Sequence, residues 1–481
     1  MVGRQAAAIL GILALGAAAG PGHGAPYPWQ PAPSYPLQAV AQFAPTPAGD
    51  VTPKDAAARR ALARAIAMEA VIYGLPAVYQ YREMFQQALD PTSPRFTGFN
   101  RFAHDRDLAG PDYKAFKSPN SDTLYSNAWL DLTAGPVLIE TPDVPLKYYT
   151  LNFLDMFSNA SNIGTRTFGS KGARYLIATA GWTGEVPAGA TLFRVATPHV
   201  WILMRVFAQK PAEVAQARAV QDAVRIAPLK PSASTQDHPP PDVASAGGYL
   251  KVLDHILRTD GHPDQEDALV YRFRAIGVGG REPFDLASLD PETRAGIAAG
   301  FDDAMTVITA SRAQLGTPTG SGWSKVEKAR YGFNYLSRAT INYVGLGANV
   351  DDENLSFNTF VDGAGATLDG AKADYALALR PPPSVNAFWS VTLYDARTLA
   401  LYPNALNRYL INDRTPGLKV EADGSVRLQI QHAKPTTGGN WLPAPDGPFY
   451  LVVRSYLPKP EMISGGWRPE PVVAAPHAAT R

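Results

Sequence analysis

The spacing of apolar residues changes twice along this chain of 481 residues, and that change limits its fold more than any single motif. From about residue 137, apolar and polar side chains alternate in short runs, which is the period of β-strands. Between about 211 and 346 the apolar residues recur at three- and four-residue spacing, as in helices. From about 375 the alternation returns. The sequence therefore predicts two strand-rich blocks separated by a helical block.

The same patterns predict individual elements. Strands are expected at 148–156, 174–180, 191–196, 199–207, 388–396, 426–433 and 449–457. Helices are expected at 52–72, 211–225, 248–258, 263–276, 291–315 and 331–346. In the first helix Thr52 is the expected cap and Pro53 the first helical residue, and Gly74 and Pro76 are expected to end it.

Composition indicates a folded chain without a nucleic-acid partner. Hydrophobic residues make up 46% of the sequence and charged residues 18%, which is enough apolar surface for sizeable cores. The 44 Lys and Arg residues balance 43 Asp and Glu residues without any long run of one sign, so the field that attracts phosphate backbones is missing. We expect a small-molecule ligand and no nucleic acid.

The first 24 residues have the pattern of an export signal. Arg4 is followed by an apolar run at 6–19 and by small residues at 22–25. The run is shorter than the roughly 20 apolar residues that cross a bilayer. Cysteine is absent, which suits an oxidising compartment and excludes a lipoprotein anchor. We predict an exported protein, periplasmic or secreted, with no transmembrane segment in the mature chain.

The predicted fold class is α+β, with several segments in a fixed order. A signal peptide at 1–24 precedes a Pro-rich tether at 25–51. The remaining segments are a helix with a first β domain at 52–228, a helical connecting region at 229–348, a second β domain at 349–473 and a tail at 474–481.

Motifs in both strand-rich blocks resemble a known pair of families. They are NSDTLYS at 120–126, FWSVTLY at 388–394, NWLP at 440–443 and WRP at 467–469. These motifs resemble the paired domain-of-unknown-function families 1254, in the amino-terminal half, and 1214, in the carboxy-terminal half. The resemblance covers about residues 60–471. It implies two jelly-roll-like antiparallel β-sandwich domains joined by helices, often in exported bacterial proteins, and leaves the activity unsettled.

A dense polar cluster is the first candidate site. It combines an amide, three hydroxyl groups and a carboxylate ahead of Trp129, and such groups are costly to bury without partners. The cluster consists of Asn120, Ser121, Asp122, Thr123 and Tyr125. One interpretation is a polar ligand site with Trp129 as a stacking face. The other is a turn whose side chains satisfy nearby backbone groups.

The strand predicted at 449–457 is the second candidate site. Alternation puts Arg454 and Tyr456 on one face. A guanidinium beside a phenol, near Asn440 and Trp441 of the preceding loop, could hold a carboxylate or sugar hydroxyl groups. The alternative is an outer-face arginine that packs along its stem or pairs with an acid.

Asp155 is the third candidate. It continues the apolar face of the strand predicted at 148–156, so its carboxylate is expected to need a cation. Arg205 is one candidate partner, and Arg166 and Arg174 are others. An inward aspartate with a raised pKa could act as a general acid or base, whereas a structural ion pair is the favoured interpretation.

Motifs for cofactors and metals are missing from the sequence. It contains no G-x-S-x-G motif, no Walker-type lysine motif and no Gly-rich loop with Rossmann spacing. His255 and His262 flank an acidic stretch that helix capping explains, and no H-E-x-x-H motif occurs. We therefore expect no cofactor and no metal.

Three functional hypotheses remain. The first is an envelope protein that binds a small amphipathic or carbohydrate-like ligand in an aromatic-lined cleft, with homo-oligomer formation left open. The second is a cofactor-independent hydrolase or lyase with Asp122 as base and Arg454 or Arg205 as anion holder. The third is an assembly protein, which predicts large exposed apolar patches.

Overall fold

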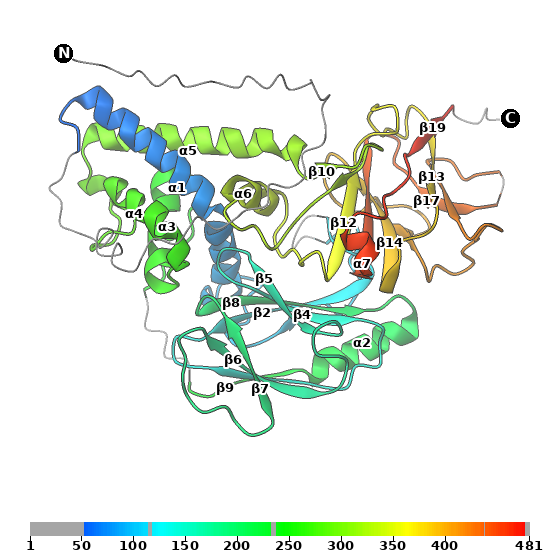
Figure 1. Cartoon of the computed structure of the whole chain (residues 1–481), viewed down its shortest axis with the longest axis horizontal. Coiled ribbons are helices and arrows are strands. Elements are labelled where there is room, and N and C mark those ends of the chain that lie inside the picture. Colours follow the sequence, from blue (N-terminus) through cyan, green and yellow to red (C-terminus); the bar gives the residue numbers. More distant parts are fainter. Residues whose placement is uncertain (1–51, 114–117, 232–236, 437, 477–481) are drawn as a thin grey trace, which may run out of the picture. The chain divides into compact units, whose positions relative to one another are not determined.

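A computed structural model describes residues 52–113, 118–231, 237–436 and 438–476. The predicted leader and tether, and the end of the tail, lie outside the described residues. Residues 52–481 belong to one compact unit. Four mostly antiparallel sheets and a group of helices make up this unit, which is an α+β architecture (Figure 1). The boundaries predicted within it stay a prediction.

The helices pack around α1 (Ala56–Met84), which continues into a π-helical turn, η2 (Phe85–Leu89). Asp55 caps α1 by accepting a hydrogen bond from the amide of Ala58. In Figure 1, α1 runs alongside α5, and it also contacts α3 and α6. The other helical bounds are α3 (Ala246–Thr259), η3 (Asp264–Glu266), α4 (Asp267–Arg272), η4 (Phe273–Ile276), η5 (Leu286–Ser288), α5 (Pro291–Ser311), η6 (Arg312–Gln314) and α6 (Tyr335–Val344).

The predicted end of the first helix was wrong. Gly74 and Pro76 lie inside α1, although an interior proline costs a helix about 3 kcal/mol. Both residues are buried, and a Cβ at Gly74 would lie 2.8 Å from the Leu253 side chain, so close packing against α3 accounts for the glycine. Tertiary burial therefore overrides the local stop signals.

The helix at Ala56–Leu89 is also long and apolar enough, by length and composition alone, to cross a membrane. The absence of a transmembrane segment from the mature chain stays a prediction. About 61% of the most apolar window of this helix lies buried inside the unit, which is how the core helix of a folded domain behaves.

The first strand-rich block forms two sheets that share one core. One has the order β1-β2-β8-β4-β5 and the other β7-β6-β3-β9. Leu124, Ile139 and Ile177 meet in the core between them, and α2 (Pro211–Ala223) contacts β2 and β8. The strands are β1 (Ala103–His104), β2 (Thr123–Asp131), β3 (Val137–Thr141), β4 (Tyr149–Leu154), β5 (Ala160–Gly164), β6 (Ala173–Thr179), β7 (Ala190–Val195), β8 (His199–Phe207) and β9 (Arg225–Pro228).

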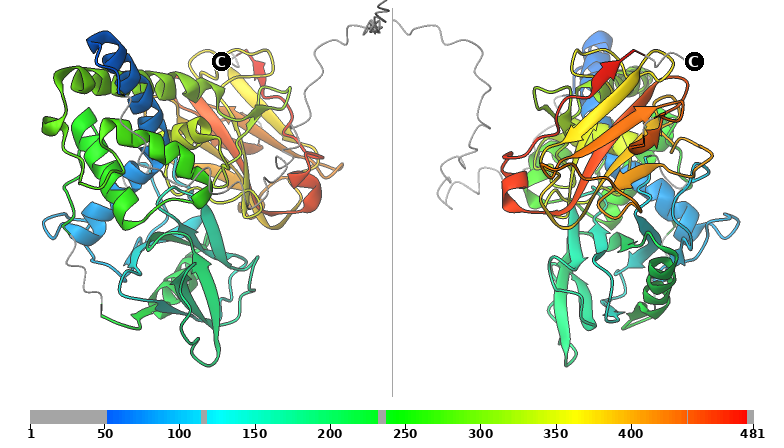
Figure 2. Two further views of the ribbon diagram at one scale, coloured as in Figure 1. Left: turned by 60° about the vertical axis from the view of Figure 1, so that its left-hand side comes forward. Right: turned by 90° about the vertical axis from the view of Figure 1, so that its right-hand side faces the viewer.

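The second strand-rich block forms two further sheets, ordered β10-β11-β12-β18-β14-β15 and β17-β16-β13-β19. Phe357, Leu377 and Val453 belong to their shared core. Figure 2 shows these yellow-to-red strands grouped apart from the teal strands of the first block. The elements are β10 (Thr317–Pro318), β11 (Ser324–Lys325), β12 (Asn354–Thr359), β13 (Asp374–Leu379), β14 (Val385–Asp395), β15 (Leu410–Asn412), β16 (Val426–Gln431), β17 (Asn440–Pro443), β18 (Phe449–Pro458), α7 (Pro460–Ile463) and β19 (Val473–Ala475).

Every strand predicted from the alternation is present, and the strand predicted at 199–207 has the bounds of β8. The helix predicted at 263–276 is instead broken into η3, α4 and η4. The end of the helix predicted at 211–225 was also wrong, because Val224 is extended and Arg225 begins β9. Short strands such as β9 and β15 carry too few residues for a period to be recognised.

Close approach of α1 and α5 at Gly300 gives a test of this packing. A Cβ at Gly300 would lie 2.3 Å from the carbonyl oxygen of Arg64, so the helices would have to separate. We expect Gly300→Ala to lower the free energy of unfolding by about 1–3 kcal/mol in urea denaturation. Ala298→Leu, on the exposed side of α5, should change it by less than about 0.5 kcal/mol. Equal losses would contradict the close packing.

Candidate functional site

Strands of both blocks and the segment after α6 enclose a cavity of about 210 Å³, which we call the cationic cavity. β2 contributes Tyr125, β8 contributes Arg205, and β18 contributes Arg454 and Tyr456. Its further lining residues include Ser118, Asn120, Val326, Lys328, Ile341, residues 344–349, Asn354, Ser356, Asn358, Tyr450 and Val452. The lining formed by the described residues contains three cationic side chains and no Asp or Glu.

Arg205 is fixed by contacts along one side of its guanidinium group. Nη2 donates to the carbonyl oxygen of Gly347 at 2.7 Å, and Nη1 donates to Oδ1 of Asn349 at 3.3 Å. The guanidinium carbon lies 5.5 Å from the ring centroid of Tyr125, in cation–π range. Arg205 is only 7% exposed, so its charge is largely removed from water.

Arg454 has a similar environment on β18. Nη1 donates to the hydroxyl oxygen of Tyr394 at 2.8 Å and to that of Thr392 at 3.3 Å, while Nη2 donates to the carbonyl oxygen of Ser118 at 3.0 Å. The side chain therefore joins the second block to the loop that precedes β2. Arg454 packs over the ring of Tyr394, as the structural alternative expected, but its face of β18 contacts the first block and is not an outer face.

Among the described residues, neither arginine forms an ion pair with a carboxylate, although the charge of Arg454 lowers the pKa of the buried Asp122. Within the described part of the chain, the hydrogen bonds of Arg205 and Arg454 go only to neutral oxygen atoms. Lys328 differs, because its Nζ lies 3.3 Å from Oδ1 of Asp351. A buried charge is costly unless it is paired, so two unpaired guanidinium groups in one cavity indicate a place for an anion.

Neutral hydrogen-bonding groups surround the two arginines. The amide nitrogen of Asn120 donates to the Tyr125 hydroxyl at 3.0 Å, and its Nδ2 donates to the hydroxyl of Tyr456. Burial raises the pKa of Tyr456, so this phenol stays neutral at physiological pH. Nδ2 of Asn354 is buried and has no hydrogen-bond partner among the described residues. These groups offer donors that a bound oxyanion can use.

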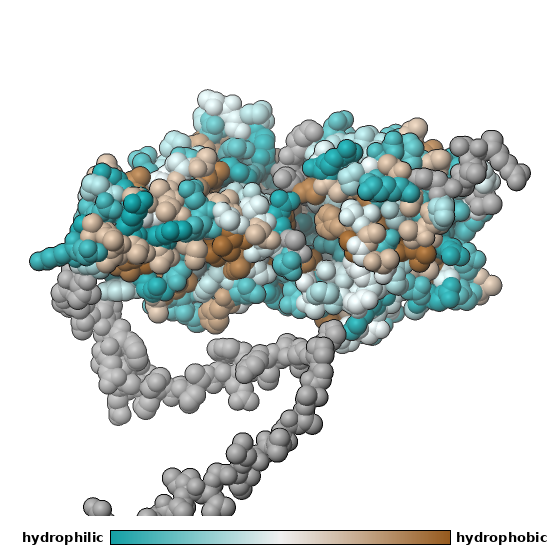
Figure 3. Space-filling model, turned by 90° about the horizontal axis from the view of Figure 1, so that it is seen from above, coloured by the Kyte–Doolittle hydropathy of each residue, from teal (hydrophilic) through white to brown (hydrophobic). Residues whose placement is uncertain are grey.

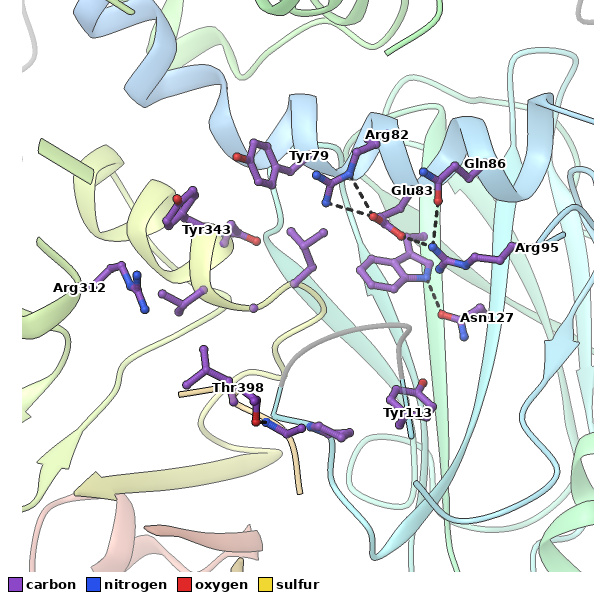
Figure 4. A pocket seen from close by; sticks show the side chains of 18 residues that line it. Tyr79, Arg82, Glu83, Gln86, Arg95, Tyr113, Asn127, Arg312, Tyr343 and Thr398 are labelled. Carbon is purple, nitrogen blue, oxygen red and sulfur yellow. Dashed lines mark hydrogen bonds and ion pairs between the residues drawn. The ribbon is translucent and has the colours of Figure 1, made fainter. Parts of the chain in front are cut away.

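A second cavity of about 740 Å³ lies next to the first, and we call it the aromatic cavity (Figure 4). Tyr79 and Trp201 line it together with Tyr113, Tyr343, Leu346 and Leu399. The indole ring of Trp201 stacks on Trp129 with centroids 5.7 Å apart. Charge in this cavity is partly compensated, because Glu83 binds both Arg82 and Arg95, at 3.2 and 2.7 Å.

The structure brings together five of the predicted site residues at the cationic cavity: Asn120, Tyr125, Arg205, Arg454 and Tyr456. The others lie elsewhere. Ser121 donates to the carbonyl oxygen of Ala109, Thr123 is buried in β2, and Trp129 belongs to the core behind Trp201. Asn440 and Trp441 belong to β17 and bind backbone carbonyl groups of their own block, so neither lines the cavity.

Asp122 does not line the cationic cavity and is fully buried. Its Oδ1 accepts a hydrogen bond from Nδ2 of Asn412 at 2.7 Å. Burial raises the pKa of Asp122 to about 6, although the hydrogen bond from Asn412 and the charge of Arg454 oppose the rise. Asp122 thus contacts the second block and is absent from the cavity lining.

Asp155 closes a turn, and the ion pair predicted for it was wrong. Its Oδ1 accepts from the amides of Phe157 and Asn159, both at 2.9 Å, and its Oδ2 accepts from Nδ2 of Asn159 at 3.0 Å. The predicted partners are engaged elsewhere, Arg166 with Glu353 and Arg174 with Glu140. Backbone amides therefore satisfy this carboxylate in place of a cation.

Several cavity residues were missed from the sequence. Gly347, Asn349 and Asn354 lie in or next to the irregular segment after α6, where no period marks them. Lys328 lies between short elements for the same reason. Among the described residues, no group of three or more His, Cys, Asp or Glu side chains is placed to hold a metal ion.

Comparison with known proteins assigns the chain to families. One family profile, "Protein of unknown function (DUF1254)", matches residues 99–228, and a second, "Protein of unknown function (DUF1214)", matches residues 353–460. The chain contains both domains. The resemblance inferred from the sequence motifs is confirmed. Arg205 lies within the DUF1254 match and Arg454 within the DUF1214 match, so the cationic cavity is built from both.

Two solved structures are similar to this chain. The VPA0106 protein from Vibrio parahaemolyticus is 24% identical, with a TM-score of 0.67 over 86% of this chain and 100% of that one. A putative uncharacterized protein from Burkholderia cenocepacia is 10% identical, with a TM-score of 0.43 over 88% of this chain and 91% of that one. The first likeness shows the fold alone. No curated protein matches the sequence.

The turn at Asp155 gives a stability prediction. Asp155→Asn replaces Oδ2, which accepts from the Asn159 side chain, with an NH2 group that cannot accept, so one hydrogen bond is lost. We expect a lower Tm in calorimetry and a loss of about 1–2 kcal/mol in the free energy of unfolding. Asn159→Ala should lower the free energy of unfolding by a similar amount, and the double variant should lose no more than either single variant. A variant of unchanged stability that had lost its ligand would contradict this structural role.

Burial of Asp122 gives a pH prediction. A carboxyl group whose pKa is higher in the folded state stabilises the fold at acid pH, and this stabilisation is lost as the pH rises through about 6. The variant Asp122→Asn has no such proton to lose. We therefore expect its free energy of unfolding, relative to the parent, to increase by up to about 3 kcal/mol between about pH 4 and pH 7.5. Urea denaturation across that range measures the difference, and parallel profiles would contradict it.

Proposed function

We propose that this chain binds a small organic anion, with its carboxylate held between Arg205 and Arg454 in the cationic cavity. The observation that carries the proposal is the pair of guanidinium groups, one from each domain, that form no ion pair with any described residue and line a cavity whose described lining contains no acid. Arginine forms forked hydrogen bonds that match carboxylate geometry. Both groups retain N–H donors that are unused within the described residues.

Cavity size and walls narrow the class of ligand. A volume of about 210 Å³ suits a small ligand such as a carboxylate with a short stem. Tyr125, Tyr450 and Tyr456 provide ring surfaces, and Val326 and Val452 add apolar surface. These walls favour an amphipathic organic acid over a fully hydrated inorganic ion.

The alternative, a hydrolase or lyase with Asp122 as base, has less support. Its two anion holders share one cavity, but the carboxylate of Asp122 does not line that cavity and is bound to Asn412. A general base must come within hydrogen-bond reach of its substrate. The geometry therefore favours binding over catalysis by this group.

Three further parts of the proposal concern the type of fold, the export of the chain and the character of its surface. The core shared by the two sheets of each block supports two jelly-roll-like sandwiches. The leader pattern at 1–24 supports export to the periplasm or beyond. On the face in Figure 3, hydrophobic residues lie in small groups among hydrophilic ones, which favours ligand binding over a purely assembling role.

Titration calorimetry with propionate tests the proposal, with propylamine as the oppositely charged control. We expect the parent protein to bind propionate and not propylamine. Arg205→Gln and Arg454→Gln should each weaken propionate binding by at least tenfold, because truncating a charged partner costs about 2–5 kcal/mol. Arg64→Gln removes an exposed arginine paired with Asp303 and should leave binding unchanged.

Arg454 also holds the loop at Ser118, so the fold of each variant is checked by its Tm. Arg454→Lys keeps the charge and should retain part of the affinity, whereas Arg454→Gln should not. Propionate binding that persists in both glutamine variants would overturn the proposal. Equal binding of propionate, phosphate and sulfate would show a general oxyanion site and overturn the preference for a carboxylate.

A further inference from the structure

We infer that the two cavities are parts of one elongated site, and that its ligand is a carboxylic acid carrying an aromatic ring. This inference rests on the proposed function, because the carboxylate is taken to bind between Arg205 and Arg454. It adds the aromatic cavity as a second binding surface and an aromatic ring as the part of the ligand that binds there.

The two cavities share a wall. Val344, Gly345 and Leu346, directly after α6, line both of them. The loop before β2 also borders both cavities. Pro119 lines the aromatic cavity, and its neighbours Ser118 and Asn120 line the cationic cavity. The two cavities are therefore adjacent along both the segment after α6 and the loop before β2.

Gly345 marks open space at this shared wall. A Cβ added there would meet no atom within 4 Å. The φ of Gly345 is −173°, an extended conformation that any residue adopts, so the backbone does not require glycine. The neighbouring Gly347 behaves differently, since a Cβ there would lie 2.7 Å from Leu203. A side chain at position 345 would therefore occupy space that is open at the junction of the two cavities.

The aromatic cavity suits an uncharged ring. Trp201 lines it with an indole that is already stacked on Trp129 and held by a hydrogen bond from its Nε1 to Oδ1 of Asn127 at 3.1 Å. Tyr343 lies opposite Tyr79 in Figure 4, with ring centroids 6.2 Å apart. Preformed aromatic surfaces of this kind bind rings at low entropic cost.

Charges in the aromatic cavity are partly paired. Glu83 pairs with Arg82 and Arg95, and Arg312 also lines the cavity, so the charges shown in Figure 4 are partly compensated. The volume of about 740 Å³ is more than three times that of the cationic cavity. The bulk of the ligand is therefore expected here, and its single carboxylate in the cationic cavity.

Calorimetry with two matched probes, propionate and 3-phenylpropionate, tests the inference. Both carry the same carboxylate, and only the second carries a ring. We expect the parent protein to bind 3-phenylpropionate at least tenfold more tightly. Gly345→Phe should remove most of this advantage by filling the junction, whereas Gly345→Ala should change it by less than twofold.

Tyr343→Ala provides a second variant away from the junction, because Tyr343 lines only the aromatic cavity. It should weaken binding of 3-phenylpropionate and leave propionate binding unchanged. Equal affinities for the two probes in the parent protein would overturn the elongated site. An advantage that survives in both Gly345→Phe and Tyr343→Ala would also overturn it.

The two levels of the account fail differently. If the parent protein bound neither probe, the anion site itself would be wrong. If it bound propionate through Arg205 and Arg454 but gained nothing from the ring, the anion site would stand and the elongated site would fall. Gly345→Phe could lose binding of both probes while keeping its Tm. In that case the ratio of the two affinities in Tyr343→Ala would decide, and a ratio unchanged from the parent protein would count against the inference.

Discussion

Arg205 and Arg454 are positive charges from two different domains that meet in one cavity without a carboxylate partner among the described residues. Such a pair is unfavourable in an isolated fold because the two charges repel and have lost part of their hydration. In place of water, carbonyl and hydroxyl oxygen atoms of the protein accept their hydrogen bonds. Under the proposed function, a bound anion would complete the charge balance of the cavity.

The contacts that build the cavity also join the two domains. Asn120 reaches Tyr456, Arg454 reaches Ser118, and Asp122 reaches Asn412 across the boundary between the strand-rich blocks. Polar groups in these positions are costly unless both blocks are in place. Under the proposed function, anion binding and association of the two domains would depend on the same hydrogen bonds, so each would stabilise the other.

Alternation in the sequence predicted β8 and β18 and placed Arg454 and Tyr456 on one face, which local periodicity can do. It could not predict the partner of Arg205, because the carbonyl group of Gly347 is 142 residues away along the chain. The same limit explains the wrong partner for Asp155 and the wrong end of α1 at Pro76. In each case a tertiary contact, invisible to a local pattern, decides the outcome.

A crystal structure of the protein soaked with 4-bromobenzoate, using the anomalous signal of bromine, would test the central claim most directly. The account predicts the carboxylate within hydrogen-bond distance of both Arg205 and Arg454, and the bromine peak toward Trp201 and Tyr343. A carboxylate bound away from the two arginines, or a cationic cavity left empty at saturating ligand, would contradict it.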